Sequence, residues 1–319
     1  MHFWRNIPLV LVALLALTGA MVGYAQDDNA EFIRQAAENT QALDSYVTLI
    51  DQTIEIGLGD AMDDMFGGLG GDGEGLPGMG EGLPGMGDSM GMEVNQTIER
   101  RTDADGNSYT IVTQNLGGMF ADMMGGGEDA MTVVEVVERG DQRWYRFTGD
   151  GLLTQGAPEG WFQQEDFSQP GELAVYDDIG SENPFTLSDL TAEGVSITEL
   201  PGETIDGQDM RVFEIAFDEA YMRERFDEVM RGMDAVSTEG GDMADFENFV
   251  AGSTTTQRVW IGTQDNLIHR TQVVFDSGEA GLDMEGGDIP LNFSQTVTTT
   301  TNLSQFNTPV DIPDPANEV

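Results

Sequence analysis

The stretch from residue 257 to residue 275 constrains the fold more than any other part of the chain. Before a polar segment at 262–266, Val259 and Ile261 alternate with Arg258 and Trp260. After that segment, Leu267, His269, Thr271 and Val273 alternate with Ile268, Arg270, Gln272 and Val274. A period of two is typical of strands whose successive side chains point to opposite faces. The stretch therefore predicts an antiparallel hairpin with one dry and one solvated face.

Further strands are predicted wherever the same alternation recurs between short polar turns. They are expected at 46–56, 93–101, 107–114, 131–138, 143–148, 195–200, 210–217 and 291–303. The last of these contains the run SQTVTTTT, and a Thr-rich strand is typical of an exposed sheet face. Two prolines in residues 306–313 exclude that tail as a central strand, because proline cannot donate a ladder hydrogen bond.

Helical periodicity predicts a helix at 28–45 and a second amphipathic helix at 218–233. A shorter apolar set follows within 243–250. Many antiparallel strands with few helices favour an α+β fold, in which one large, strongly curved antiparallel sheet carries helices on one face.

Two Gly/Met-rich segments, 57–92 and 116–131, interrupt this pattern. The first contains the tandem repeat EGLPGMG at 74–80 and 81–87. Such a composition cannot build a packed element. Their similar composition predicts two flexible insertions at one end of the sheet, within a single domain at 26–319.

The N-terminal segment has the features of a secretory signal peptide. An apolar run at 7–22 follows Arg5, and Gly23-Tyr24-Ala25 predicts cleavage after Ala25. The alternative is a retained anchor, but the run is shorter than the ~20 residues that a spanning helix needs. Signal peptide 1–25 predicts an extracytoplasmic location, in the periplasm, in the cell envelope or secreted.

The composition excludes several classes of function. The net charge is −45, and all 13 basic residues are Arg. A chain this acidic repels nucleic acid and anionic membrane surfaces, so neither is expected as a partner beyond transient membrane contact. The chain has no Cys, which excludes disulfides, thiol catalysis, Cys-based metal sites and lipid attachment through a Cys.

Three motifs that could indicate an enzyme or a metal site have simpler explanations. His269 is the sole His beyond the predicted signal peptide, and an ordinary His on the surface or in the interior of a strand explains it. The pattern G-x-S-x-G at 87–91 lies in the Gly/Met repeat, without the strand and helix that expose a nucleophile. Asp103-Ala104-Asp105-Gly106 begins like a calcium loop but lacks the later Glu, and a hairpin turn explains it. No catalytic residue, metal or cofactor is therefore predicted.

The chain resembles the LolA-like lipoprotein-carrier superfamily, in particular its LppX/LprG-type envelope proteins. The resemblance lies in the helix at 30–45 leading into 46–56, the segment VWIGTQDNLIHRTQVVF and the closing FNTPVDIPDP. It covers about 30–56 and 130–315, with Trp260 and Ile261 as fold markers. This chain departs from the family in Gly262, where Asp is usual, in its Gly/Met insertions, and in lacking a Cys for lipid attachment. The resemblance implies a half-barrel whose concave face, covered by helices, holds an acyl chain.

Apolar side chains of the two later helical segments are the candidates for lining a lipid cavity. They are Met222, Phe226, Val229, Met230, Met233, Met243, Phe246 and Phe249. Methionine adapts to varied apolar partners, although ordinary core packing of an amphipathic helix explains the same stripe. Burial of one CH₂ yields ~0.8 kcal/mol, so an apolar groove can bind a lipid without any catalytic group.

Two functions of different classes follow from these observations. The first is a non-enzymatic extracytoplasmic carrier that holds a lipid or an acylated ligand in an apolar cavity. The second is an envelope sensor or protein-interaction module on the same fold, in which the acidic surface or the Gly/Met segments engage an envelope protein.

Overall fold

The structure is a computed structural model, and it describes residues 28–58, 90–116, 131–149, 157–167, 190–225, 252–282 and 291–317. The predicted signal peptide, nearly all of the two Gly/Met-rich segments and most of the second predicted helix lie outside these ranges. Their predictions, and that of a single domain at 26–319, stay predictions.

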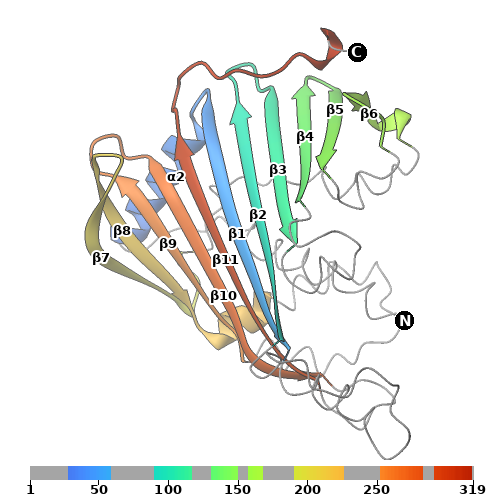
Figure 1. Ribbon diagram of the computed structural model, residues 1–319. Helices are drawn as coiled ribbons and strands as arrows, with labels where there is room; N and C mark the ends of the chain where they lie inside the picture. The colour runs from blue at the N-terminus through green and yellow to red at the C-terminus, as the bar shows by residue number, and fades with distance from the viewer. Residues whose placement is uncertain are drawn as a thin grey trace, which may run out of the picture.

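One antiparallel sheet of eleven strands dominates the described residues (Figure 1). Helix α2 (Asp28–Gln41) precedes β1 (Tyr46–Leu58), β2 (Met90–Thr102), β3 (Ser108–Leu116), β4 (Met131–Arg139), β5 (Gln142–Gly149), β6 (Phe162–Gln163), β7 (Val195–Ile205), β8 (Gln208–Phe217), β9 (Thr254–Gly262), β10 (Ile268–Leu282) and β11 (Leu291–Ser304). Short 3-10 turns occupy Gln164–Asp166 and Pro315–Asn317, and residues 219–225 are helical. The prediction of an α+β fold with one large, curved antiparallel sheet is confirmed.

The strand order is β6-β5-β4-β3-β2-β1-β11-β10-β9-β8-β7. Two meanders, β1 to β6 and β7 to β11, are thus joined where the first strand pairs with the last. This pairing runs from Val47–Ser304 to Leu58–Phe293. The Thr-rich strand therefore lies in the middle of the sheet, and Thr301 is buried. On the other side of the strand Thr296, Thr298 and Thr300 are half-buried, so the prediction of an exposed face is wrong.

The hairpin at 257–275 forms as predicted, with one correction to its register. An irregularity between Ile268 and Arg270 interrupts the pairing of β10 with β9. Ile268 consequently shares a face with Ile261, and both are fully buried in the core beneath α2. Strict alternation predicts instead that Ile268 shares a face with Arg270, and this prediction is wrong. The two predicted fold markers, Trp260 and Ile261, are neighbours in β9 and lie on opposite faces. Trp260 therefore packs in a second cluster with Met210 and Val212.

Helix α2 covers one wing of the sheet, over β7, β9 and β10. Its small and apolar stripe, Ala30, Ile33, Ala36 and Ala37, packs on Phe213, Ile215, Val259, Ile261, Ile268 and Leu303. The helix ends at Gln41 rather than at 45 as predicted. Ser45 Oγ donates to the carbonyl of Thr308 (2.9 Å), so the C-terminal segment is bonded to the short connection between α2 and β1.

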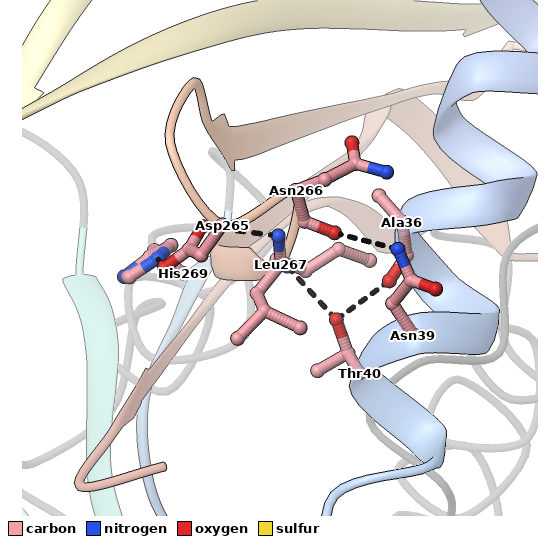
Figure 2. A network of polar contacts seen from close by, with 8 residues as sticks. Ala36, Asn39, Thr40, Asp265, Asn266, Leu267 and His269 are labelled. Atoms are coloured by element: carbon pink, nitrogen blue, oxygen red, sulfur yellow. Dashed lines mark hydrogen bonds and ion pairs between the residues drawn. The ribbon is translucent and has the colours of Figure 1, made fainter.

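Helix α2 is fixed to the β9–β10 turn by buried and exposed hydrogen bonds (Figure 2). Thr40 Oγ1 accepts the backbone N–H of Ile268 (2.9 Å) and donates to the carbonyl of Ala36 (2.6 Å). Asn39 Nδ2 donates to the carbonyl of Asn266 (3.2 Å), which has a left-handed backbone with φ of 53°. The hydroxyl of Thr40 thus satisfies a backbone donor that the irregular register of β10 would otherwise leave unpaired.

The opposite wing contains a buried charged group on the face away from α2. Glu135 accepts two hydrogen bonds from Arg146, from Nε (2.5 Å) and from Nη2 (2.6 Å), and a third from the hydroxyl of Tyr109. Arg146 also lies over the ring of Trp161, 4.5 Å from its centroid. Burial opposes ionisation, but these donors, Arg146 foremost, lower the pKa of Glu135 below its usual value.

Both Gly/Met-rich segments attach at one end of the sheet, as predicted. The last residue of β1, Leu58, pairs with the first of β2, Met90. Near the end of β3, Asn115 pairs with Met131, the first residue of β4. The strands extend slightly into the predicted segments, because Leu58, Met90 and Leu116 belong to the ladder.

Replacing Thr40 with Val should lower the free energy of unfolding by about 2 kcal/mol, because the buried N–H of Ile268 loses its acceptor. Thr40→Ser, which keeps the hydroxyl, should lose only about 1 kcal/mol through the missing methyl group. Urea denaturation of the three proteins measures both values. Equal stability of Thr40→Val and the wild type would contradict the role given to this hydrogen bond.

Replacing Glu135 with Gln should cost about 3 kcal/mol at neutral pH, because Arg146 is left without its charged partner. The lowered pKa of Glu135 means that the unfolded chain binds the proton more readily. Its contribution is therefore complete above the usual carboxyl pKa and disappears as the pH falls through the folded-state value. The difference in unfolding free energy between wild type and variant, measured from pH 7 to pH 3, should shrink accordingly. Glu214→Gln, which breaks an exposed pair with Arg258, is the control and should cost under about 1 kcal/mol.

Candidate functional site

The side of the sheet on which α2 packs is called the inner face here. Cα partners in neighbouring strands share a face, so the register groups the inner-face side chains into rows that cross the sheet. The four acidic residues of β1 and β2, Asp51, Glu55, Glu93 and Glu99, all occupy alternate positions on the opposite face. The inner face of these two central strands therefore carries no carboxylate, although the chain as a whole is strongly acidic.

An unbroken apolar row crosses the inner face from β1 to β5. Ile50 pairs with Ile98, Ile98 with Val112, Val112 with Val134, and Val134 with Phe147. Strands lie about 4.8 Å apart, so the row spans about 19 Å. Helix α2 contacts β7, β9 and β10, so α2 lies over the other wing.

Aromatic rings close the β5 end of this row. Phe147, Phe162 and Phe167 stack on one another, with ring centroids 5.7 to 6.0 Å apart. Tyr145 adds a fourth ring, 6.1 Å from Phe162. Stacked arrangements of this kind add to the stabilisation from burial. The row therefore has a rigid apolar wall at one side of the sheet.

A row of amide and hydroxyl side chains runs parallel to the apolar row, two residues away from it on each strand. Thr299 pairs with Gln52, Gln52 with Gln96, Gln96 with Gln114, and Gln114 with Thr132. Gln52 Nε2 donates to Thr299 Oγ1 (3.1 Å). Amides are uncharged and can both donate and accept, so this row presents polar groups without charge. Beyond it the face is apolar again, with Val297, Ile54 and Val94 paired across β11, β1 and β2.

On its other side, the apolar row borders a polar row that contains a cation. Thr48 pairs with Arg100, and Arg100 pairs with Thr110. Three buried atoms in or beside this row have no hydrogen-bond partner within the described residues, namely Thr48 Oγ1, Arg100 Nε and Thr102 Oγ1. Buried polar atoms are nearly always paired, so three neighbouring exceptions on one face require an explanation.

One predicted cavity-lining residue lies within the described residues. Met222 is buried in helical residues 219–225, directly after β8. Asp218 caps this helix by accepting the N–H of Tyr221 (2.9 Å), and the Tyr221 ring stacks on Phe217. The other predicted lining residues lie outside the described residues: Phe226, Val229, Met230, Met233, Met243, Phe246 and Phe249. A cavity-lining role for all eight stays a prediction.

His269 and the calcium-like sequence at 103–106 have structural roles, and residues 87–89 of the G-x-S-x-G pattern lie outside the described residues. His269 Nε2 lies 3.0 Å from Asp265 Oδ2, and its ring meets Phe306 edge-on. Burial opposes ionisation of Asp265, but hydrogen bonds from Gln208, His269 and Leu267 lower its pKa. Asp103 accepts the N–H groups of Asp105 and Asn107, so the calcium-like sequence is a turn. Among the described residues, no group of three or more His, Asp or Glu is arranged to hold a metal ion.

The sequence pattern predicted the apolar stripe of α2 but not the rows of the inner face. Every member of a row comes from a different strand, so only the register brings Gln52, Gln96 and Gln114 together. The one signal available was the alternation of side chains along each strand. Alternation assigns each residue to a face but does not align one strand with the next.

Within the described part of the chain, no helix is long and apolar enough to cross a membrane. No protein family model matches the chain, and no curated protein matches it.

Solved structures similar to this one include three bacterial proteins. The lipoprotein LppX of Mycobacterium tuberculosis is 13% identical with a TM-score of 0.37, and the match covers 90% of this chain and 100% of that one. LprF of Mycobacterium bovis is 11% identical with a TM-score of 0.33, covering 90% and 96%. A LolA superfamily protein of Nitrosomonas europaea is 10% identical with a TM-score of 0.20, covering 89% and 94%.

Proposed function

We propose that this protein is an extracytoplasmic carrier that binds a lipid or an acylated ligand against the inner face of its sheet, without covalent chemistry. The observation that carries the proposal is the apolar row Ile50, Ile98, Val112, Val134 and Phe147, which lies on the wing away from α2. Ile98, Val112 and Val134 are buried and form one apolar cluster with Phe162 and Phe167. An acyl chain that inserts beside them would be shielded from water.

The dimensions of the row suit one acyl chain. Two chains end to end fill the ~30 Å hydrocarbon core of a bilayer, so one chain extends about 15 Å. The row spans about 19 Å across five strands. Each buried CH₂ contributes about 0.8 kcal/mol, so a long chain can bind with useful affinity after the costs of association.

One further observation supports a binding function rather than catalysis, and one sequence prediction supports the location. The described His and Asp residues that contact each other are His269 at the start of β10 and Asp265 in the β9–β10 turn, and this contact holds the turn to the strand. The predicted signal peptide at 1–25 supports an extracytoplasmic location, where lipids and acylated proteins are exchanged between membranes. The predicted lining residues from Met222 to Phe249 would complete the cover over the inner face.

Native mass spectrometry of protein purified without detergent should show a bound species of lipid mass. Ile98→Gln should weaken binding of a long-chain lipid about tenfold or more, because it places a polar group in the apolar row. Thr97→Gln is the matched control, since Thr97 is the neighbouring residue on the opposite, exposed face.

Ile98→Ala serves as a second variant that keeps the row apolar, and far-UV circular dichroism verifies that each variant is folded. It should reduce lipid affinity less than Ile98→Gln does. A wild-type protein found only at its own mass, and unable to take up lipid from vesicles, would refute the proposed function.

A further inference from the structure

The polar row of Thr48 and Arg100 has features that the apolar row does not explain. Thr48 is 2% exposed, yet its hydroxyl has no hydrogen-bond partner. Arg100 is its Cα partner on β2, and the Arg100 Nε is also buried and unpartnered. Thr102, two residues further along the same face of β2, has a third unpartnered hydroxyl. Three hydrogen-bond donors thus lie together on the inner face with no acceptor.

The one contact of Arg100 with a carboxylate leaves most of its donors available. Its Nη2 lies 3.5 Å from Glu138 Oε2, beyond the usual range for a hydrogen bond. Glu138 already accepts the hydroxyl of Ser108 (2.8 Å) and a hydrogen bond from Arg143. Glu138 is thus shared by Arg143, which lies closer, and Arg100, so one negative charge faces two positive charges here.

The location of this surplus charge matters in a chain of net charge −45. The Arg100 side chain is 20% exposed, and it borders Ile98 and Ile50 of the apolar row. An ionised group on a largely buried surface is stable only when it is paired. A ligand that brings one negative charge and several acceptor oxygens would satisfy Arg100, Thr48 and Thr102 together.

We propose that Arg100, Thr48 and Thr102 bind the carboxylate of a fatty acid or of another singly charged acyl lipid, whose chain lies along the apolar row toward Phe147. This inference rests on the proposed function and specifies the ligand class. Arginine presents planar paired donors that match a carboxylate. One surplus positive charge matches a single negative charge better than the ≈ −1.5 to −2 of a phosphate monoester.

The test compares hexadecanoate with its uncharged methyl ester, by isothermal titration calorimetry with the full chain. Wild-type protein should bind hexadecanoate at least tenfold more tightly than the ester, because the ester has no charge to pair with Arg100. Arg100→Met should abolish this preference by lowering the affinity for hexadecanoate, and Arg100→Lys should retain part of it. Arg101→Met is the matched control, because Arg101 lies on the opposite face and pairs with Glu99 there.

Thr48→Val gives a second readout that does not depend on replacing the cation. Valine has the shape of threonine without the unpartnered hydroxyl, so the free variant should be at least as stable as the wild type. Its affinity for hexadecanoate should nevertheless fall several-fold. A variant less stable than the wild type, with unchanged affinity, would show that the hydroxyl has a structural role and would overturn its assignment to the ligand.

The outcomes separate this inference from the proposed function. Equal binding of acid and ester by the wild type would overturn the carboxylate site and leave the lipid carrier intact. Tighter binding of hexadecyl phosphate than of hexadecanoate would also overturn it, in favour of a phosphate head group. Failure to bind any of the three amphiphiles would refute the proposed function itself.

Discussion

The pairing of β1 with β11 is the interaction on which the rest of the structure depends. It joins two meanders that are each built from local hairpins into one sheet of eleven strands. The contacts are remote in sequence, since Val47 pairs with Ser304. Closing so long a loop costs conformational entropy, which the long ladder between the two strands and the burial of Leu303 under α2 offset. Without this pairing, the inner face would be divided into two narrow faces.

Charge is distributed unequally between the two sides of this sheet. On β1 and β2 the acidic residues lie on the outer face, where water solvates them. The inner face carries apolar rows separated by amides and hydroxyls, and Arg100 borders the apolar row there, 3.5 Å from Glu138. Desolvation explains the separation, because an ionised group on the inner face costs free energy unless a partner neutralises it. The same physics makes Arg100 selective for an anion.

Much of the fold could be predicted from the chain alone, and the site could not. Alternation located the strands and helical periodicity located α2, because both patterns are local consequences of backbone geometry. The bulge at Ile268 escaped prediction, since the N–H of Ile268 donates to Oγ1 of Thr40, a residue 228 positions away in the sequence. Of the predicted lining residues, Met222 is buried as an apolar helix residue should be. The polar row around Arg100 was missed, because nothing local marks an arginine whose partner in space is Thr48.

The sequence by itself determined the class of structure, an antiparallel sheet with few helices, and excluded thiol chemistry and nucleic-acid binding. It did so because composition and period act residue by residue, without knowledge of neighbours. Only the tertiary structure decided which strands pair and in what register. That register aligns Ile50, Ile98 and Val112 into an apolar row and places Arg100 at its border. A shift of one residue in any of these strands would turn its row to the other face, so the site exists only as a property of the assembled sheet.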